Sequence, residues 1–178
     1  MSDPNKSILE TERLSLRPIT MDDVDSLFLL FSDPIAMKYY PAVKTMQETR
    51  DWAQLVIQHH AKRGFSPYAC ITKKDTLFVG YCGHMFQKDV DGKDEVEIGY
   101  GLIRKYWHKG YATEAAMTCK HYGFREMKLA RLVSLIRPEN VPSVRVAERN
   151  GMQKENEIVR WNNRHFVYAI SNEAGKEL

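Results

Sequence analysis

Alternating apolar and polar positions mark three extended segments in the first half of the chain. Residues 13–17 alternate and are followed by Pro18, which ends a strand. Residues 68–72 and 77–81 have the same extended character and flank the polar turn 73–75. These segments predict one strand followed by a hairpin.

The second half of the chain predicts four further strands. Asp91 and Gly92 form a dipeptide typical of a hairpin turn, after which residues 95–103 are expected to form a strand. The remaining strands are expected near residues 132–136, 154–161 and 165–170.

Helical spacing of apolar residues, together with capping signals, predicts four helices. The first follows the N-cap residue Thr20 and ends before Pro34. The second begins at the capping box in residues 45–48 and ends near Gly64. The third and fourth are expected at residues 113–127 and 140–150, and Gly151 ends the last one.

The order of these elements predicts one α/β (α+β) domain across residues 1–178. The predicted order is a strand, two helices, three largely antiparallel strands, a helix, a strand, a helix and two strands. One mixed sheet covered by helices is the compact arrangement of these elements. No repeat or linker divides the chain, and its length suits one domain. The polar tail at residues 171–178 is expected to fray.

Composition and charge exclude several classes of protein. Hydrophobic residues make up 43% and charged residues 28%, as is usual for a soluble globular protein. The net charge is only +3 and no basic run occurs, which argues against a nucleic-acid partner. No apolar run approaches the ~20 residues that cross a bilayer, and no apolar signal segment opens the chain, so we expect a cytoplasmic protein without a membrane partner. The three cysteines and the histidines show no metal-binding spacing, so no metal is expected.

Residues 97–115 combine a strand, a basic turn and the start of a helix. The first N–H groups of a helix have no partner within it, and the helix dipole adds positive charge at this end. Gly110 lets the backbone approach a ligand closely, and Arg104, Lys105 and Lys109 add positive charge. Such a site favours a ligand that carries phosphate. The structural alternative is a glycine at a helix entrance beside solvated lysines.

Two segments resemble the GCN5-related N-acetyltransferase (GNAT) family, which transfers acetyl groups from acetyl-coenzyme A to amines. Residues 107–112, Trp-His-Lys-Gly-Tyr-Ala, fill the family's phosphate-loop motif Gln/Arg-x-x-Gly-x-Gly/Ala except at its first position. Trp107 and the run after His108 look like the branch that acetylates ribosomal-protein N-termini, which usually has glycine where His108 stands. Residues 140–152 are similar to the family's Asn-x-x-Ser-x-x-x-x-Glu-Lys-x-Gly-Phe segment. The resemblance covers residues 11–170, which would form the N-acetyltransferase domain.

The resemblance implies a mostly antiparallel mixed sheet with about four helices, splayed between its fourth and fifth strands at residues 95–103 and 132–136. Free backbone groups at the splay would hold the pantetheine arm of acetyl-coenzyme A, and the loop amides would hold its pyrophosphate. Asn140 would bond the pantetheine arm, and Arg145 or Arg149 would approach the 3′-phosphate. The implied cofactor-binding residues are Gly101, Leu102, Ile103, Trp107, His108, Lys109, Gly110, Tyr111, Ala112, Thr113, Asn140, Arg145 and Arg149.

The same resemblance implies two catalytic residues. Glu97 stands at the family's general-base position, and Glu95 shares its face of the strand because side chains alternate with period two. Both could instead be solvent-facing strand residues opposite lysines. Ser143 stands where the motif supplies the group that protonates the departing thiolate. Water could also fill this role, because no tyrosine occurs between Asn140 and Gly151.

The expected partner is an amine-bearing acceptor, either a protein N-terminus, a lysine or a small molecule, and residues 39–41 are candidates to line its cleft. The amine would attack directly in a ternary complex. A catalytically silent sensor that binds acetyl-coenzyme A, or a protein-interaction module, is the alternative. A dinucleotide-binding oxidoreductase is disfavoured, because the glycines that follow Gly99-Tyr100-Gly101 have the wrong spacing. Exposed edge strands are compatible with a homodimer.

Overall fold

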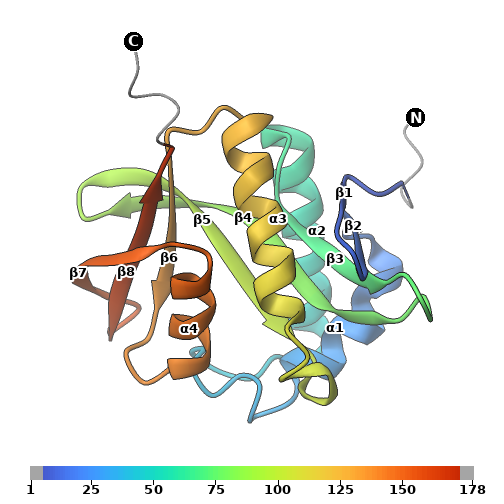
Figure 1. Ribbon diagram of the computed structural model, residues 1–178. Coiled ribbons are helices and arrows are strands. Elements are labelled where there is room, and N and C mark those ends of the chain that lie inside the picture. The colour runs from blue at the N-terminus through green and yellow to red at the C-terminus, as the bar shows by residue number, and fades with distance from the viewer. Residues whose placement is uncertain (1–5, 173–178) are drawn as a thin grey trace.

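Eight strands form one mixed sheet in the computed structural model, which describes residues 6–172 (Figure 1). The strand order is β1-β2-β3-β4-β5-β6-β8-β7, and every neighbouring pair is antiparallel except β5 and β6, which run parallel. The strands are β1 (Leu9–Glu10), β2 (Leu14–Pro18), β3 (Pro67–Thr72), β4 (Phe78–Val90), β5 (Lys93–Leu102), β6 (Arg131–Ile136), β7 (Gln153–Arg160) and β8 (Asn163–Ser171).

Four helices cover the two faces of this sheet: α1 (Val24–Phe31), α2 (Met46–Arg63), α3 (Tyr111–Arg125) and α4 (Val141–Arg149). On β4, the ring of Tyr81 lies 5.1 Å from the ring of Trp52 on α2. The next residue, Cys82, faces the other way, with its sulfur 3.8 Å from that of Cys119 on α3. The helices α1 and α2 therefore cover one face, and α3 and α4 lie together over the other (Figure 1).

The boundaries of α2 follow from its capping residues, as the sequence predicts. Glu48 donates its N–H to the Thr45 hydroxyl at 3.2 Å, and its carboxylate accepts the Thr45 N–H at 2.7 Å. At the other end, Gly64 has φ +79°, a left-handed conformation that ends the helix and that glycine adopts without steric cost.

The predicted splay lies between β5 and β6 and is confirmed. These two strands share a single residue pair, Glu97 with Val133, and no further β5–β6 pair forms within residues 6–172. Figure 1 shows the two strands diverging toward the end at which α4 begins. The divergence leaves one edge of β5 without a strand partner over its last residues.

A few boundaries differ from those expected. The two-residue strand β1 was not predicted, because so short a segment shows no alternation. Helix α3 begins at Tyr111, two residues before the expected start, and ends at Arg125. Ser171 is the last residue of β8, so the tail expected to fray does not begin there, and residues 173–178 lie outside the described residues. No helix in the described range is long and apolar enough to cross a membrane.

Candidate active site

The backbone of β5 turns alternate residues toward β4 and toward the splay. Ile103 donates its N–H to Val79 on β4 at 3.0 Å, and Gly101 is paired with Tyr81 on the same strand. The expectation that Gly101 and Ile103 offer free backbone groups is therefore wrong, since both face β4. Of the three residues expected to be free, only Leu102 turns its backbone toward the splay.

Two side chains donate hydrogen bonds to β5 carbonyl groups that face the splay. The Trp107 indole N–H donates to the Leu102 carbonyl at 2.8 Å, and the Tyr40 hydroxyl donates to the Tyr100 carbonyl at 3.4 Å. The N–H groups of Tyr100 and Leu102 point in the same direction as these carbonyls. The splayed edge therefore presents backbone donors from two successive outward-facing residues.

The turn between β5 and α3 is built from two left-handed residues. His108 has φ +61°, and Gly110, which precedes the first residue of α3, has φ +82°. The first helical N–H donor that finds an intrahelical acceptor is that of Glu114, which bonds to the Gly110 carbonyl at 3.1 Å. The N–H groups of residues 111–113 precede it and are open to a ligand at the positive end of the helix dipole.

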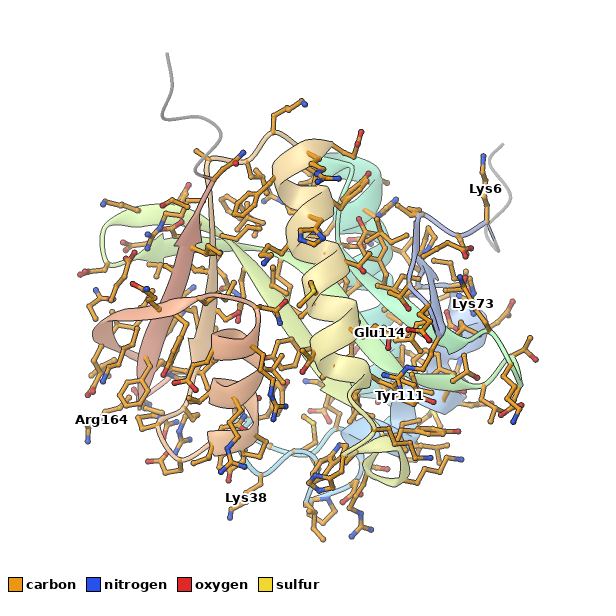
Figure 2. All side chains as sticks on the ribbon, viewed as in Figure 1. Lys6, Lys38, Lys73, Tyr111, Glu114 and Arg164 are labelled. Atoms are coloured by element: carbon orange, nitrogen blue, oxygen red, sulfur yellow. The ribbon has the colours of Figure 1, made fainter. Side chains whose placement is uncertain are left out.

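An arginine directly before β2 fastens this turn. The Arg13 guanidinium contacts the Glu114 carboxylate at 2.6 Å and donates to the Lys109 carbonyl at 2.9 Å. It also lies 4.7 Å from the centre of the Tyr111 ring. In Figure 2, Tyr111 and Glu114 lie at the first turn of α3, on the side facing β1 and β2. Hydrogen bonds from one side chain thus hold both the turn and the helix that follows it.

A cavity of about 510 Å³ lies between this turn, β5 and α4. Its wall includes most of the residues expected to bind a cofactor, but Lys109 and Ile103 do not line it. Lys109 turns its carbonyl to Arg13 and its ammonium to the Tyr106 ring at 5.5 Å. The expected residues that do line the cavity are Gly101, Leu102, Trp107, His108, Gly110, Tyr111, Ala112, Thr113, Asn140, Arg145 and Arg149, together with Ser143.

Asn140 and Ser143 are fixed at the start of α4. The Asn140 side-chain oxygen caps the helix by accepting the Ser143 N–H at 3.3 Å. The Tyr100 hydroxyl donates to the Ser143 carbonyl at 3.0 Å, which ties α4 to β5 across the splay. Sequence reasoning missed the role of Tyr100, because only the three-dimensional arrangement brings it to Ser143.

A second cavity, of about 310 Å³, contains Glu97 and meets the first cavity at the splay. The two cavities share part of their walls, so a molecule in one can contact a molecule in the other. The shared residues are Tyr39, Tyr40, Tyr81, Tyr100, Asn140 and Ser143. Residues 39–41, the candidates to line the acceptor's cleft, lie in the wall of this second cavity.

Glu97 is buried on the wall of this second cavity and its carboxylate has two donors. The Gln87 side-chain amide donates to one oxygen at 2.6 Å, and the Leu135 N–H donates to the other at 3.2 Å. Burial raises the pKa of Glu97, and the two hydrogen bonds and the charge of Arg160 oppose that rise only in part. Glu97 is therefore a buried carboxylate that takes up a proton more readily than an exposed one.

Glu95 has a different environment from Glu97, although both are buried. Its carboxylate pairs with Arg131 at 3.0 Å, and Arg131 also contacts Glu155 at 2.7 Å. The alternative that Glu95 and Glu97 face solvent is wrong for both residues. Glu95 belongs to an ion-pair network between strands, whereas Glu97 borders a cavity. No group of three or more metal-ligating side chains occurs within residues 6–172.

Comparison with known proteins agrees with this arrangement. The family model of the acetyltransferase (GNAT) domain matches residues 13–153. The chain belongs to the GNAT acetyltransferase family. It is 38% identical to the uncharacterized protein YkkB of Bacillus subtilis (strain 168) over 164 residues, which cover 92% of this chain and 95% of YkkB.

Solved GNAT structures share the fold. A GNAT-family acetyltransferase from Bacillus anthracis is 34% identical, with a TM-score of 0.78, and the match covers 92% of this chain and 97% of that one. RimL, a ribosomal L7/L12 alpha-N-protein acetyltransferase solved in complex with coenzyme A, is 22% identical with a TM-score of 0.77, and the match covers 95% and 99% of the two chains. The second likeness shows the fold alone.

Histidine stands at position 108, where the resemblance to the ribosomal-protein branch leads us to expect glycine. His108 adopts a left-handed φ of +61°, a conformation that costs a residue with a Cβ roughly 1–2 kcal/mol. Glycine, which the resemblance leads us to expect at this position, would adopt this conformation without that cost. Gly110 holds the second left-handed position, directly before α3. Its close approach to a ligand stays a prediction.

Proposed function

We propose that this GNAT domain transfers an acetyl group from acetyl-coenzyme A to a primary amine by direct attack in a ternary complex. The single observation that carries the proposal is the junction of two cavities at the splay. One cavity has the donor-rich turn before α3 in its wall, and the other has the buried carboxylate of Glu97. A donor and an acceptor could therefore meet beside Tyr100 and Ser143.

The first cavity would hold acetyl-coenzyme A, which supplies the acetyl group as a thioester. The N–H groups of residues 111–113, at the positive end of α3, would hold the pyrophosphate. Arg145 and Arg149 line the same cavity and would bind the 3′-phosphate, and Asn140 would bond the pantetheine arm. RimL, which shares the fold, was solved in complex with coenzyme A, and this supports the assignment.

The Leu102 and Tyr100 N–H groups face the splay beside the junction of the cavities. A backbone N–H aimed at the carbonyl oxygen of the reacting group would stabilise the negative charge that develops there. Such a donor typically contributes about 10²–10³ in rate. The Trp107 indole, which occupies the Leu102 carbonyl at 2.8 Å, would help hold this part of β5 in place.

Glu97 would accept the proton that the amine loses when it attacks. Its raised pKa brings the carboxylate closer to the range in which a general base works at neutral pH. Ser143, in the wall of both cavities, would protonate the departing thiolate directly or through water. Catalysis by a positioned acid or base contributes about 10²–10⁴ in rate.

Two measurements test the proposal. Acetyl-coenzyme A at 100 times its Kd should stabilise the protein by about 2.7 kcal/mol, measured as a rise in Tm. Acetyl-coenzyme A should also release free thiol when amines, polyamines, aminoglycosides and peptides are supplied as acceptors. Stabilisation without thiol release from any acceptor would instead identify a silent binding protein, and no stabilisation at millimolar ligand would reject the cofactor site.

A further inference from the structure

The charged groups around the second cavity indicate which chemical groups an acceptor bound there would carry. Of the described residues in its wall, Glu97 is the one Asp or Glu residue and Arg137 the one Lys or Arg residue. His165 also lines the cavity, but its pKa is lowered, chiefly by burial, although its hydrogen bond with the Asn163 carbonyl opposes that change. His165 is therefore neutral. The cavity has one carboxylate and one guanidinium in its wall.

The Arg137 guanidinium has N–H donors that could bind a ligand. Its Nε contacts the Glu139 carboxylate at 3.3 Å, but the Glu139 side chain is 60% exposed, so the pair is weak and screened by solvent. Within the described residues, the two terminal nitrogens of Arg137 have no hydrogen-bond partner. A guanidinium of this kind binds a carboxylate with two parallel hydrogen bonds.

A second arginine adds positive charge near the same wall. The Arg160 guanidinium bonds only neutral acceptors in the described part of the chain: the Gln87 side-chain oxygen at 3.2 Å, the Lys88 carbonyl at 3.0 Å and the Asp89 carbonyl at 3.1 Å. It also lies 4.9 Å from the ring centre of Trp161, which lines the cavity. Its charge is thus not neutralised by an ion pair, and a polycationic acceptor would meet repulsion here.

The spacing of Glu97 and Arg137 suits a short molecule. Glu97 accepts the Leu135 N–H at 3.2 Å, so its carboxylate lies level with Leu135 along β6. Arg137 follows two residues later, a distance of about 7 Å along an extended chain. An amine near Glu97 and a carboxylate at Arg137 could therefore belong to one small molecule in a cavity of about 310 Å³.

We infer that the acceptor is a small amine that also carries a carboxylate, an amino acid whose carboxylate is bound by Arg137 while its amine faces Glu97. This inference rests on the proposed acetyl transfer. In the reaction, the amine nitrogen forms a bond to the acetyl carbon, one amine proton passes to Glu97 and the thioester C–S bond breaks. The leaving sulfur takes a proton from Ser143, directly or through water, and departs as the free thiol. Arg137 takes part in none of these bonds and acts on acceptor specificity alone.

The test compares linear amino acids of increasing chain length with their carboxamides and with spermidine, in a thiol-release assay with acetyl-coenzyme A. We expect kcat/KM for the best carboxylate to exceed that of its carboxamide by about 10-fold to 100-fold, as for a charge-assisted hydrogen bond. Arg137→Gln should abolish this ratio without changing the Tm shift produced by acetyl-coenzyme A. The matched control is Arg164→Gln: Arg164 is 67% exposed, pairs with Glu157 and lies on the outer side of the β7–β8 hairpin (Figure 2).

Three results would overturn the inference in distinguishable ways. Equal rates for carboxylates and carboxamides, or a preference for spermidine, would refute the acceptor class while leaving acetyl transfer intact. Absence of thiol release with every amine, in a protein that acetyl-coenzyme A still stabilises, would refute acetyl transfer itself and the acceptor class with it. A carboxylate preference that survives Arg137→Gln would refute the role of Arg137.

Discussion

The side-chain amide of Gln87 donates to the Glu97 carboxylate across 2.6 Å while its own oxygen accepts from Arg160 at 3.2 Å. The arginine can only donate, so it fixes which end of the Gln87 amide faces Glu97. Together with the Leu135 N–H, this bond favours the ionised carboxylate against the effect of burial. Gln87 was not singled out in the sequence, because the contact depends on the pairing of β4 with β5.

Gln87→Leu should therefore raise the pKa of Glu97 further above its ordinary value of 4.5. A general base must be deprotonated, so the acidic limb of the pH profile of kcat/KM should move to higher pH, with little change on the plateau. Gln47→Leu, on the exposed surface of α2, is the control and should leave the limb in place. An unshifted limb in Gln87→Leu would show that another group controls it.

Glu97→Gln and Glu95→Gln form a matched pair, two residues apart on the same face of β5. Glu97→Gln removes the proposed base and should lower kcat by about 10²–10⁴, while the Tm shift caused by acetyl-coenzyme A stays unchanged. Glu95→Gln should leave kcat within a few-fold but lower stability by about 1–3 kcal/mol, because it weakens a buried pair with Arg131. The reverse pattern would assign the chemistry to Glu95.

Local signals were enough to predict much of the fold from the sequence. The capping residues Thr45 and Glu48 are three positions apart, so the start of α2 could be read directly. The glycine at 110 and the N-cap at Asn140 were found for the same reason: each acts within one turn of chain. The N-cap signal gives the start of α4 beside the first cavity, whereas α3 begins two residues before its expected start.

Long-range contacts and strand orientation could not be read in the same way. Arg13 and Glu114 are 101 positions apart, and nothing near either residue indicates the other. The pairing of β5 with β4 decides which residues of β5 turn their backbone groups toward β4 and which turn them toward the splay. An error of one residue in the register exchanges these two sets. For this reason the backbone groups of Ile103 were wrongly expected to be free at the splay, and those of Tyr100 were not expected to face it.

Gly110→Ala tests whether the left-handed turn before α3 matters for binding. With φ +82°, an alanine would cost roughly 1–2 kcal/mol of stability, and its Cβ would lie 3.3 Å from an Arg13 nitrogen. Gly64→Ala is the control, because φ is +79° and a Cβ would meet nothing within 4 Å. Both variants should lose similar stability in urea unfolding, but only Gly110→Ala should weaken the stabilisation by acetyl-coenzyme A. Equal affinity of both variants for acetyl-coenzyme A would show that Gly110 has no role in binding it.

Arg13→Met tests the contact that fastens the turn to β2. Hydrogen bonds to a charged group contribute about 1.5–3 kcal/mol, and because the Arg13 side chain is 44% exposed we expect a loss of about 1 kcal/mol. Affinity for acetyl-coenzyme A should also fall, since the Lys109 carbonyl loses its donor. The control Lys73→Met removes an exposed pair with Glu10 and a hydrogen bond to the Thr11 carbonyl, but no contact with the turn itself. It should change stability less and binding not at all.

The loss caused by Arg13→Met should depend on pH in a defined direction. Burial opposes ionisation of Glu114, but hydrogen bonds from Thr11 and Arg13 outweigh it and lower its pKa in the folded protein. A carboxyl whose folded pKa is lowered contributes stability above its unfolded pKa and loses it as the pH falls through the folded pKa. The stability difference between the wild type and Arg13→Met, measured by urea unfolding, should therefore be constant near neutral pH and shrink below about pH 4.3. A difference that persists at pH 2 would mean that Arg13 acts through its packing on the Tyr111 ring rather than through Glu114.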